Sequence, residues 1–175
     1  SGATVSISQY YGSGDMKAVS ITTHTAIVFS MIGAVVLTVI GYFTTDYFLG
    51  LCRVPEDIFE ESSVYMKIFY LGLIGTFLYN MGAGILRAIG DTKRPLYYLT
   101  TAGIVNVILN LIFVIGCDMS VAGVALATVL SQCVSVALLL RCMCKMEGSC
   151  KLEMKKLGIH KEKAILLLRH GFPAG

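Results

Sequence analysis

Uncharged polar side chains stand out within long apolar stretches of this sequence, because they are the groups there that could bind a ligand. Asn106 and Asn110 are four residues apart, so they share one face of a helix. Thr128 and Gln132 have the same spacing further along, and Tyr65 lies near the start of an earlier stretch. Carbonyl and hydroxyl oxygens of this kind can replace the hydration shell of a cation.

Two interpretations of these polar groups remain open. In one, they hold helices together through hydrogen bonds, as small polar side chains often do in membranes. In the other, they line a water-filled cavity that binds a cation or a substrate. Catalytic residues and a metal site are not predicted. No acid, base or Ser–His pair lies deep in these stretches, and the six cysteines lack the paired spacing of zinc ligands.

Four stretches without formal charge indicate the helices that must position these groups. No charged residue occurs in 18–45, 68–86, 95–117 or 119–140. A helix needs about 20 apolar residues to cross the hydrocarbon of a bilayer, so each gap predicts one transmembrane helix. The charged fraction is 14% and the mean hydropathy +0.74, whereas a soluble domain carries about 25% charged residues. We therefore predict an all-α membrane fold, a polytopic helix bundle whose solvent is the lipid bilayer.

Lysine and arginine are distributed unevenly between the two ends of these helices. Twelve of the fourteen fall on one side: Lys17, Arg87, Lys93, Arg94, Arg141, Lys145, Lys151, Lys155, Lys156, Lys161, Lys163 and Arg169. The other side has Arg53 and Lys67 and most of the acids. Cytoplasmic loops are rich in Lys and Arg, so the basic side is predicted to face the cytoplasm. The expected location is the plasma membrane, the inner membrane in a bacterium, and the net charge of +3 requires no nucleic acid partner.

Turn residues mark the ends of the expected helices. Gly90 is placed to end the second long helix in a left-handed turn, and Asp91 and Thr92 could cap the next one. Pro95 suits the first turn of that helix. His24, near the cytoplasmic start of the first long helix, is expected to be a hydrogen-bonded interfacial residue. Residues 116–120 are too short a connection for anything but antiparallel neighbours.

The run from Asn80 to Pro95 reads Asn-Met-Gly-Ala-Gly-Ile-Leu-Arg-Ala-Ile-Gly-Asp-Thr-Lys-Arg-Pro and closely resembles the MATE (multidrug and toxic compound extrusion) family. Segments 7–15, 121–128 and 170–175 also resemble parts of this family, so the similarity covers essentially the whole chain. Its most specific part is the predicted cytoplasmic loop. The signature residues of that loop are Arg87, Gly90, Asp91, Lys93, Arg94 and Pro95.

The resemblance implies most of the amino-terminal lobe of a twelve-helix, two-lobe transporter. Residues 1–144 would hold the tail of the second helix and helices three to six. Residues 145–170 form a basic, partly amphipathic stretch that either lies along the headgroups or, as we favour, links the two lobes. Residues 171–175 would begin the seventh helix. The second lobe, outside this sequence, would then be the partner of this one.

The resemblance also implies a function. Members of this family are antiporters that export organic cations, drugs and other amphiphiles, with Na⁺ or H⁺ as the coupling ion and no other cofactor. Their two lobes alternate access across the membrane. The alternative is a flippase of related architecture for lipid-linked oligosaccharides. Such a protein should carry extra basic residues toward its cavity, and the deep stretches here contain none.

Four site positions are carried over by the same resemblance. Relatives with a cation site in this lobe use a Tyr, an Asn, an Asp and a Thr, which match Tyr65, Asn106, Asn110 and Thr128. Asn110 therefore stands where the family has an acid. An amide neither titrates nor carries a full charge, which weakens the prediction of a proton site here.

Overall fold

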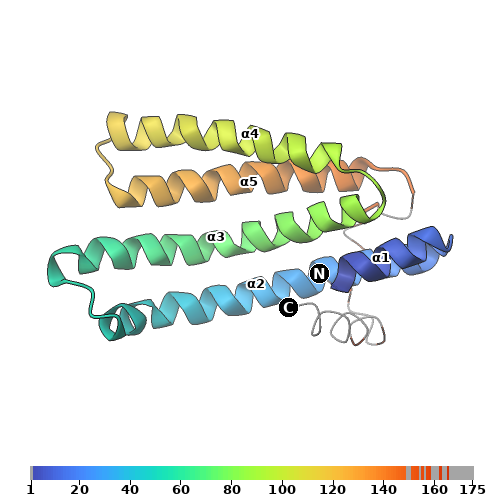
Figure 1. Cartoon of the computed structure of the whole chain (residues 1–175), viewed down its shortest axis with the longest axis horizontal. Coiled ribbons are helices and arrows are strands. Elements are labelled where there is room, and N and C mark those ends of the chain that lie inside the picture. Colours follow the sequence, from blue (N-terminus) through green and yellow to red (C-terminus); the bar gives the residue numbers. More distant parts are fainter. Residues whose placement is uncertain are drawn as a thin grey trace.

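The computed structural model (Figure 1) describes residues 2–148, 151–153, 155, 157–158, 162 and 165. Within these residues the chain is helical and has no strand. The elements are α1 (Gly2–Gly12), α2 (Met16–Leu51), α3 (Glu56–Ala88), α4 (Lys93–Asn110), the π-helix η1 (Leu111–Gly116) and α5 (Val121–Lys145). Residues 171–175 and most of 154–170, including the expected start of a further helix, lie outside the described residues.

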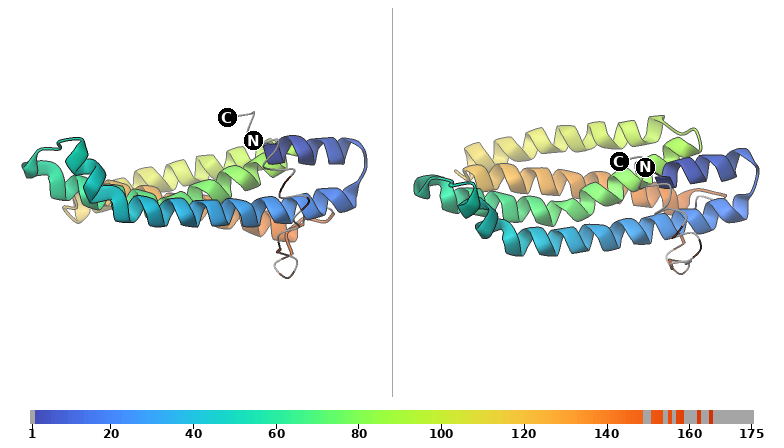
Figure 2. Two further views of the ribbon diagram at one scale, coloured as in Figure 1. Left: turned by 90° about the horizontal axis from the view of Figure 1, so that it is seen from below. Right: turned by 60° about the horizontal axis from the view of Figure 1, so that its bottom comes forward.

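Among the described residues, four helices are long and apolar enough to cross a membrane: α2, α3, α4 with η1, and α5. This confirms the four predicted transmembrane helices. They lie side by side in the order α4, α5, α3, α2 (Figures 1 and 2). Consecutive helices run in opposite directions, so the α2–α3 and α4–α5 connections share one end of the bundle. The α3–α4 connection and the end of α5 share the other. This is the separation of basic and acidic loops that the sequence predicts.

The helices are longer than the charge-free gaps. α3 begins at Glu56, well before the gap that starts at residue 68, and its first turns carry Asp57 and other acids. α2 likewise continues past residue 45 to Leu51. A gap in charge measures the hydrocarbon thickness, whereas a helix continues into the headgroup region, where charged side chains are solvated. The gaps therefore locate the spans but not the helix ends.

The turns between helices follow the predicted chemistry with one exception. Gly90 has φ +89° and ends α3 in the left-handed region, where a side chain is strained. The backbone N–H of Arg94 donates to the Asp91 carboxylate at 3.2 Å, so Asp91 caps the start of α4. Thr92 occupies the N-cap position but makes no side-chain cap bond, so its predicted capping role is wrong. The Asp91 carboxylate, one residue earlier, already accepts the backbone N–H of Arg94.

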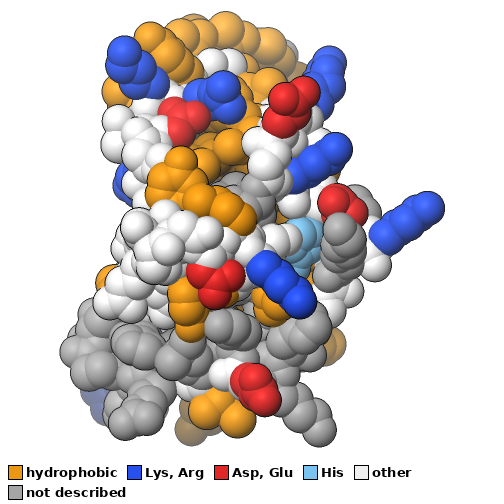
Figure 3. Space-filling view, turned by 90° about the vertical axis from the view of Figure 1, so that its right-hand side faces the viewer, with side chains coloured by type: hydrophobic (Ala, Val, Ile, Leu, Met, Phe, Trp, Pro, Cys, Tyr) orange, Lys and Arg blue, Asp and Glu red, His pale blue; other side chains and the backbone are white. Residues whose placement is uncertain are grey.

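The apolar core lies in the inner half of the bundle, toward the basic end. Its fully buried side chains come from α1, α2, α3 and α5 and include Ile7, Ile27, Leu86, Leu139 and Met143. α1 packs against both α2 and α3 there. Figure 3 looks onto this end, where lysine and arginine side chains surround the apolar surface. α4 stands apart, since only 6% of its most apolar segment is buried.

The described residues 151–153, which follow α5, pack back against the bundle. The backbone N–H of Leu152 donates to the Met143 carbonyl at 3.0 Å, and the Leu152 side chain is 4% exposed. The N–H of Glu153 donates to Nε2 of His24 at 3.0 Å. Nδ1 of His24 bonds the Ser20 carbonyl at 2.8 Å. The ring can make both hydrogen bonds at once only if it is neutral and carries its hydrogen on Nδ1.

Glycines allow the helix backbones to approach closely at defined points. A Cβ on Gly41 of α2 would lie 2.2 Å from the ring of Tyr70 on α3, and a Cβ on Gly82 of α3 would lie 2.4 Å from Leu139 on α5. Beside the contact of Gly41 with Tyr70, the Thr38 hydroxyl donates to the Tyr70 backbone carbonyl at 2.9 Å. Gly33 faces open space. The close approach of α2 and α3 therefore requires glycine at position 41, whereas position 33 has room for a side chain.

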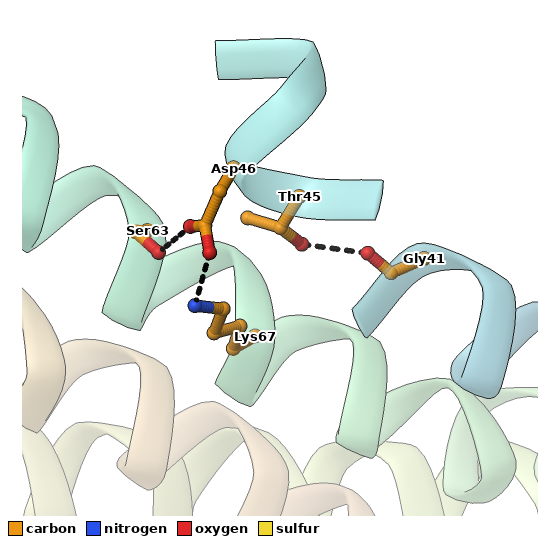
Figure 4. Close-up of polar contacts among 5 residues, drawn as sticks. All are labelled: Gly41, Thr45, Asp46, Ser63 and Lys67. Carbon is orange, nitrogen blue, oxygen red and sulfur yellow. Dashed lines mark hydrogen bonds and ion pairs between the residues drawn. The ribbon is translucent and has the colours of Figure 1, made fainter. Parts of the chain in front are cut away.

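A charged cluster joins the outer parts of α2 and α3 (Figure 4). Lys67 donates to the Asp46 carboxylate at 2.8 Å, and the Ser63 hydroxyl donates to the other oxygen of the same carboxylate. The Lys67 ammonium also lies 5.9 Å from the centre of the Tyr42 ring. The side chains of Lys67 and Asp46 are 29% and 57% exposed. The Lys67 ammonium and the Asp46 carboxylate therefore neutralise each other beside the apolar spans.

Gly41→Val is predicted to destabilise the protein by about 1–3 kcal/mol, because the new side chain must displace the Tyr70 ring. Gly33→Val is the matched control, since it adds the same side chain to the same helix in open space. Thermal unfolding of the full-length protein in detergent measures the difference. Equal melting temperatures for the two variants would contradict the close contact.

His24→Ala is predicted to speed amide hydrogen exchange at residues 151–153, because the Glu153 N–H loses its acceptor. Thr25→Ala is the control: Thr25 is also buried, but its hydroxyl bonds Ile21 within the same helix. Hydrogen-exchange mass spectrometry on the full-length protein compares the two. Unchanged exchange in the His24 variant would show that another contact holds this segment.

Candidate functional site

A chain of polar side chains joins α4 and α5 in the outer half of the bundle. The Asn106 amide donates to the Thr128 hydroxyl at 3.4 Å and to the Ser131 hydroxyl at 3.3 Å. The Asn110 amide donates to the Asn106 side-chain carbonyl at 3.0 Å. The spacing of four on each helix brings these groups to the same interface, as the sequence predicts. The structure thus places Asn106, Asn110 and Thr128 in one hydrogen-bonded network.

A small cavity lies on the other side of Thr128, between α3 and α5. Its volume is about 20 Å³, enough for one water molecule. Tyr65 and Thr76 of α3 and Thr128 and Gln132 of α5 supply its polar lining, while Gly72 leaves room where a side chain would project. Thr128 therefore belongs both to the amide network and to the cavity. Through it, Tyr65 joins the other three predicted site residues.

Two side-chain carbonyl oxygens at this interface are buried without a hydrogen-bond partner. They belong to Asn110 and Gln132. A buried amide oxygen without a partner costs about 1–3 kcal/mol, so these atoms are acceptors for something the protein chain does not supply. Neither carries a charge. Gln132 lines the cavity beside Thr128, whereas Asn110 lines a separate cavity with Leu111 and Val124. Each oxygen could accept a hydrogen bond from a water molecule or bind a desolvated cation.

Gln132 and Ser131 are the members of this site that the predicted set lacks. Gln132 follows Thr128 by four residues, which is a signal in the sequence, but nothing there shows that its carbonyl stays unpaired. The role of Asn106 in binding a cation or a substrate stays a prediction, and the structure shows its hydrogen bonds. Its amide already donates to two hydroxyls and its carbonyl accepts from Asn110. Asn106 organises the network, and the unpaired oxygens lie on its neighbours.

A π-helical segment follows the network directly. Leu111–Gly116 continues α4 with wider turns immediately after Asn110. Segments of this kind often occur beside functional sites, because the extra residue leaves local backbone groups less regularly paired. Gly123 of α5 packs here, where a Cβ would lie 2.8 Å from Met119 and 3.2 Å from Phe113. The sequence predicts a continuous helix through this region and contains no sign of the change.

The predicted cytoplasmic loop ties three helices together at the opposite end. Tyr79 of α3 donates its hydroxyl to the Pro95 carbonyl at 2.6 Å, and Arg87 bonds back to its own helix. Arg94 is ion-paired with Asp91 at 3.2 Å and reaches the Cys142 sulfur of α5 at 3.6 Å. These contacts set α4 against α3 and α5. The loop residues lie far along the helices from the polar network, so their role in the fold is to position it.

The comparisons with known proteins agree on one family. The MatE family model matches residues 1–112. The "Probable multidrug resistance protein YoeA" of Bacillus subtilis (strain 168) is 30% identical over 181 residues, covering 99% of this chain and 39% of that protein. The "Probable multidrug resistance protein YpnP" of the same organism is 31% identical over 131 residues, covering 74% of this chain and 29% of that protein.

The fold is similar to that of solved transporter structures. One, described as "Crystal structure of MATE in the bent conformation", superposes with a TM-score of 0.91 at 22% identity, covering 99% of this chain and 39% of that one. The chain thus spans well under half the length of the proteins it matches. The all-α, multi-pass membrane fold predicted from the sequence is confirmed.

Asn106→Leu is predicted to destabilise the protein by about 1–2 kcal/mol, because it removes an amide that serves three partners. Asn110→Leu should cost less, since it removes a single side-chain hydrogen bond and one unpaired oxygen. Thermal unfolding of the two single variants and the double variant in the full-length protein measures both costs and their coupling. Additive effects would contradict a shared network.

Proposed function

This chain belongs to the MatE family, and on that premise we propose that it forms part of a membrane transporter that exports small organic compounds. The family consists of transporters and not enzymes, which accords with the lack of catalytic residues in the deep stretches. Two curated relatives are named as probable multidrug resistance proteins. Export of organic cations, drugs or other amphiphiles is therefore the activity we propose for the whole protein.

We further propose that the polar site in the outer half of the bundle binds the coupling cation. The observation that carries this proposal is the unpaired carbonyl oxygen of Gln132, a residue that lines the same cavity as Thr128 and Tyr65. The unpaired oxygen of Asn110 belongs to the network that reaches Thr128 through Asn106. A cation that enters a region of low dielectric needs oxygen atoms in place of its hydration shell. Neutral oxygens bind it weakly enough for release, which a transport cycle requires.

The chemistry of the site favours a metal cation over a proton. A proton must reside on a group that titrates near neutral pH, and the described side chains that form the network and its cavity are amides, hydroxyls and a phenol. None of these is a carboxylate or an imidazole. Sodium needs no titratable group. We therefore propose Na⁺ as the ion that this site takes.

Coupling requires that ion and exported compound favour different arrangements of the transporter. In the proposed cycle, the ion stabilises one arrangement of two lobes and the exported compound stabilises the other. The helices of this lobe supply a suitable body for such motion. They are fixed together by the apolar core at the inner end, so the lobe can move as a unit. The second lobe of the full-length protein is the partner it moves against.

The flippase alternative is not favoured. A carrier of lipid-linked oligosaccharides should present basic residues to its cavity, and the described residues that line the cavity beside Thr128 include neither lysine nor arginine. The basic residues of this chain are concentrated at the inner end of the bundle. Their position follows the positive-inside rule.

Thr128→Val in the full-length protein is predicted to lower sodium-driven efflux by about five- to thirtyfold, as expected for the loss of one oxygen ligand worth about 1–2 kcal/mol. The change keeps the shape of the side chain. Efflux of a fluorescent organic cation from reconstituted vesicles measures the effect, with sodium and pH gradients imposed separately. Asn106→Ala should also reduce export, measured per molecule of folded protein.

Thr100→Val is the matched control. The Thr100 hydroxyl also bonds a carbonyl of its own helix, at 2.9 Å, but it is exposed and lies outside the site. Its efflux should equal that of the unmodified protein. Wild-type efflux in the Thr128 variant, or transport driven by the pH gradient alone, would contradict the proposed sodium site.

A further inference from the structure

A second polar cavity, larger than the first, opens between α4 and α5 at the inner end of the bundle. Its volume is about 600 Å³. Arg94 and Tyr98 of α4 and Arg141, Cys142 and Lys145 of α5 line it. We propose that this cavity binds the phosphate of an anionic phospholipid from the cytoplasmic leaflet.

Helical spacing turns these side chains toward one another. Arg94 and Tyr98 are one turn apart on α4, while Arg141 and Lys145 are one turn apart on α5. The Arg94 guanidinium bridges the two helices by donating to the Cys142 sulfur at 3.6 Å. Arg94 thus lines the groove from α4, and Arg141 and Lys145 line it from α5. The contact between Arg94 and Cys142 joins the two helices.

The charged side chains around the groove leave a net positive charge that one more anion can neutralise. Of its three cations, Arg94 already has a carboxylate partner in Asp91, at 3.2 Å. Arg141 and Lys145 are exposed and have no carboxylate within ion-pair distance among the described residues. Glu147 at the edge of the cavity offsets part of this charge. A phosphate diester, with one negative charge, matches what remains.

The positive-inside rule alone does not explain this arrangement. That rule requires basic residues at the cytoplasmic end but not their convergence on a cavity. Lys17 and Lys151 are exposed at the same end and line none of the described pockets. Arg94, Arg141 and Lys145 come from two helices and meet in one place.

The position of the groove favours a lipid over a soluble phosphate compound. It lies where the apolar spans of α4 and α5 end, which is the depth of the headgroups. Leu138 and the ring of Tyr98 add apolar surface to its lining, and the adjoining face of α4 is largely uncovered. Acyl chains could follow that face while the headgroup stays in the groove. Anionic lipids are enriched in the cytoplasmic leaflet, and basic pockets between helices are suited to them.

The test uses delipidated full-length transporter titrated with phosphatidylglycerol or phosphatidylcholine, with bound lipid counted by native mass spectrometry. Arg141→Gln/Lys145→Gln is expected to weaken the tightest phosphatidylglycerol binding by about thirtyfold, the size expected when two basic residues leave a headgroup. Lys17→Gln/Lys151→Gln removes the same charge from the same end and should leave that binding unchanged. Arg141→Lys/Lys145→Arg keeps both charges and should also retain it.

Several outcomes would overturn the proposal. One is equal binding of the two lipids, and another is the same loss in both neutralised variants, which would indicate general attraction to the surface. A third is binding of glycerol phosphate as tight as that of phosphatidylglycerol, which would assign the groove to a soluble compound.

A measurement on the unmutated groove keeps the test decisive if the neutralised variant does not fold. In a protein with Cys142 as its single cysteine, phosphatidylglycerol should slow the reaction of that thiol with a water-soluble maleimide, relative to phosphatidylcholine. An equal rate in the two lipids would contradict occupancy of the groove.

Discussion

The arrangement of this lobe depends on one constraint: a polar group in the hydrocarbon must find its partner within the protein, because lipid offers none. Most groups obey it locally. Thr44, Thr100 and Thr101 bond carbonyls of their own helices, and Lys67 and Asp46 neutralise each other. The network of Asn106 obeys it across helices. Among the described residues, the hydroxyls of Ser6, Thr22 and Thr23 toward the inner end and the amide oxygens of Asn110 and Gln132 are buried without a partner. The two amide oxygens are the ones that belong to the polar network and its cavity, where a ligand or a water molecule can meet them.

The inner and outer halves of the bundle differ in the kind of contacts that they contain. The inner half holds the fully buried apolar side chains, and the segment around Leu152 closes it further. The outer half contains the polar network, the small cavity and the π-helix, and α4 contributes little buried surface there. A closely packed core resists local rearrangement, whereas polar contacts beside an irregular helix can exchange at smaller cost. Rigidity at one end and adaptable polar contacts at the other are what a moving lobe with an ion site requires.

Much of this fold could be predicted from the sequence, for physical reasons that also mark the limit. The spans follow from the thickness of hydrocarbon, and Gly90 and Asp91 follow from backbone chemistry, so both are local properties. The spacing of Asn106 and Asn110 predicts a shared face. Which amide keeps a free oxygen depends on the neighbouring helix, and so does the contact of Gly41 with Tyr70. The π-helix and the return of Leu152 to the core also depend on packing between segments distant in the chain.

Thr128 shows how an ion in the cavity could act on the contact between α4 and α5. Its hydroxyl donates to the Val124 carbonyl at 3.0 Å and accepts from the Asn106 amide at 3.4 Å. A hydroxyl oxygen has two lone pairs, so one remains for a cation on the cavity side. The bond from Asn106 is long and the bond to Ser131 is similar, so Asn106 can shift between them at small cost. Occupancy of the cavity would then change how α4 is held by α5, next to the π-helix that can accommodate the change.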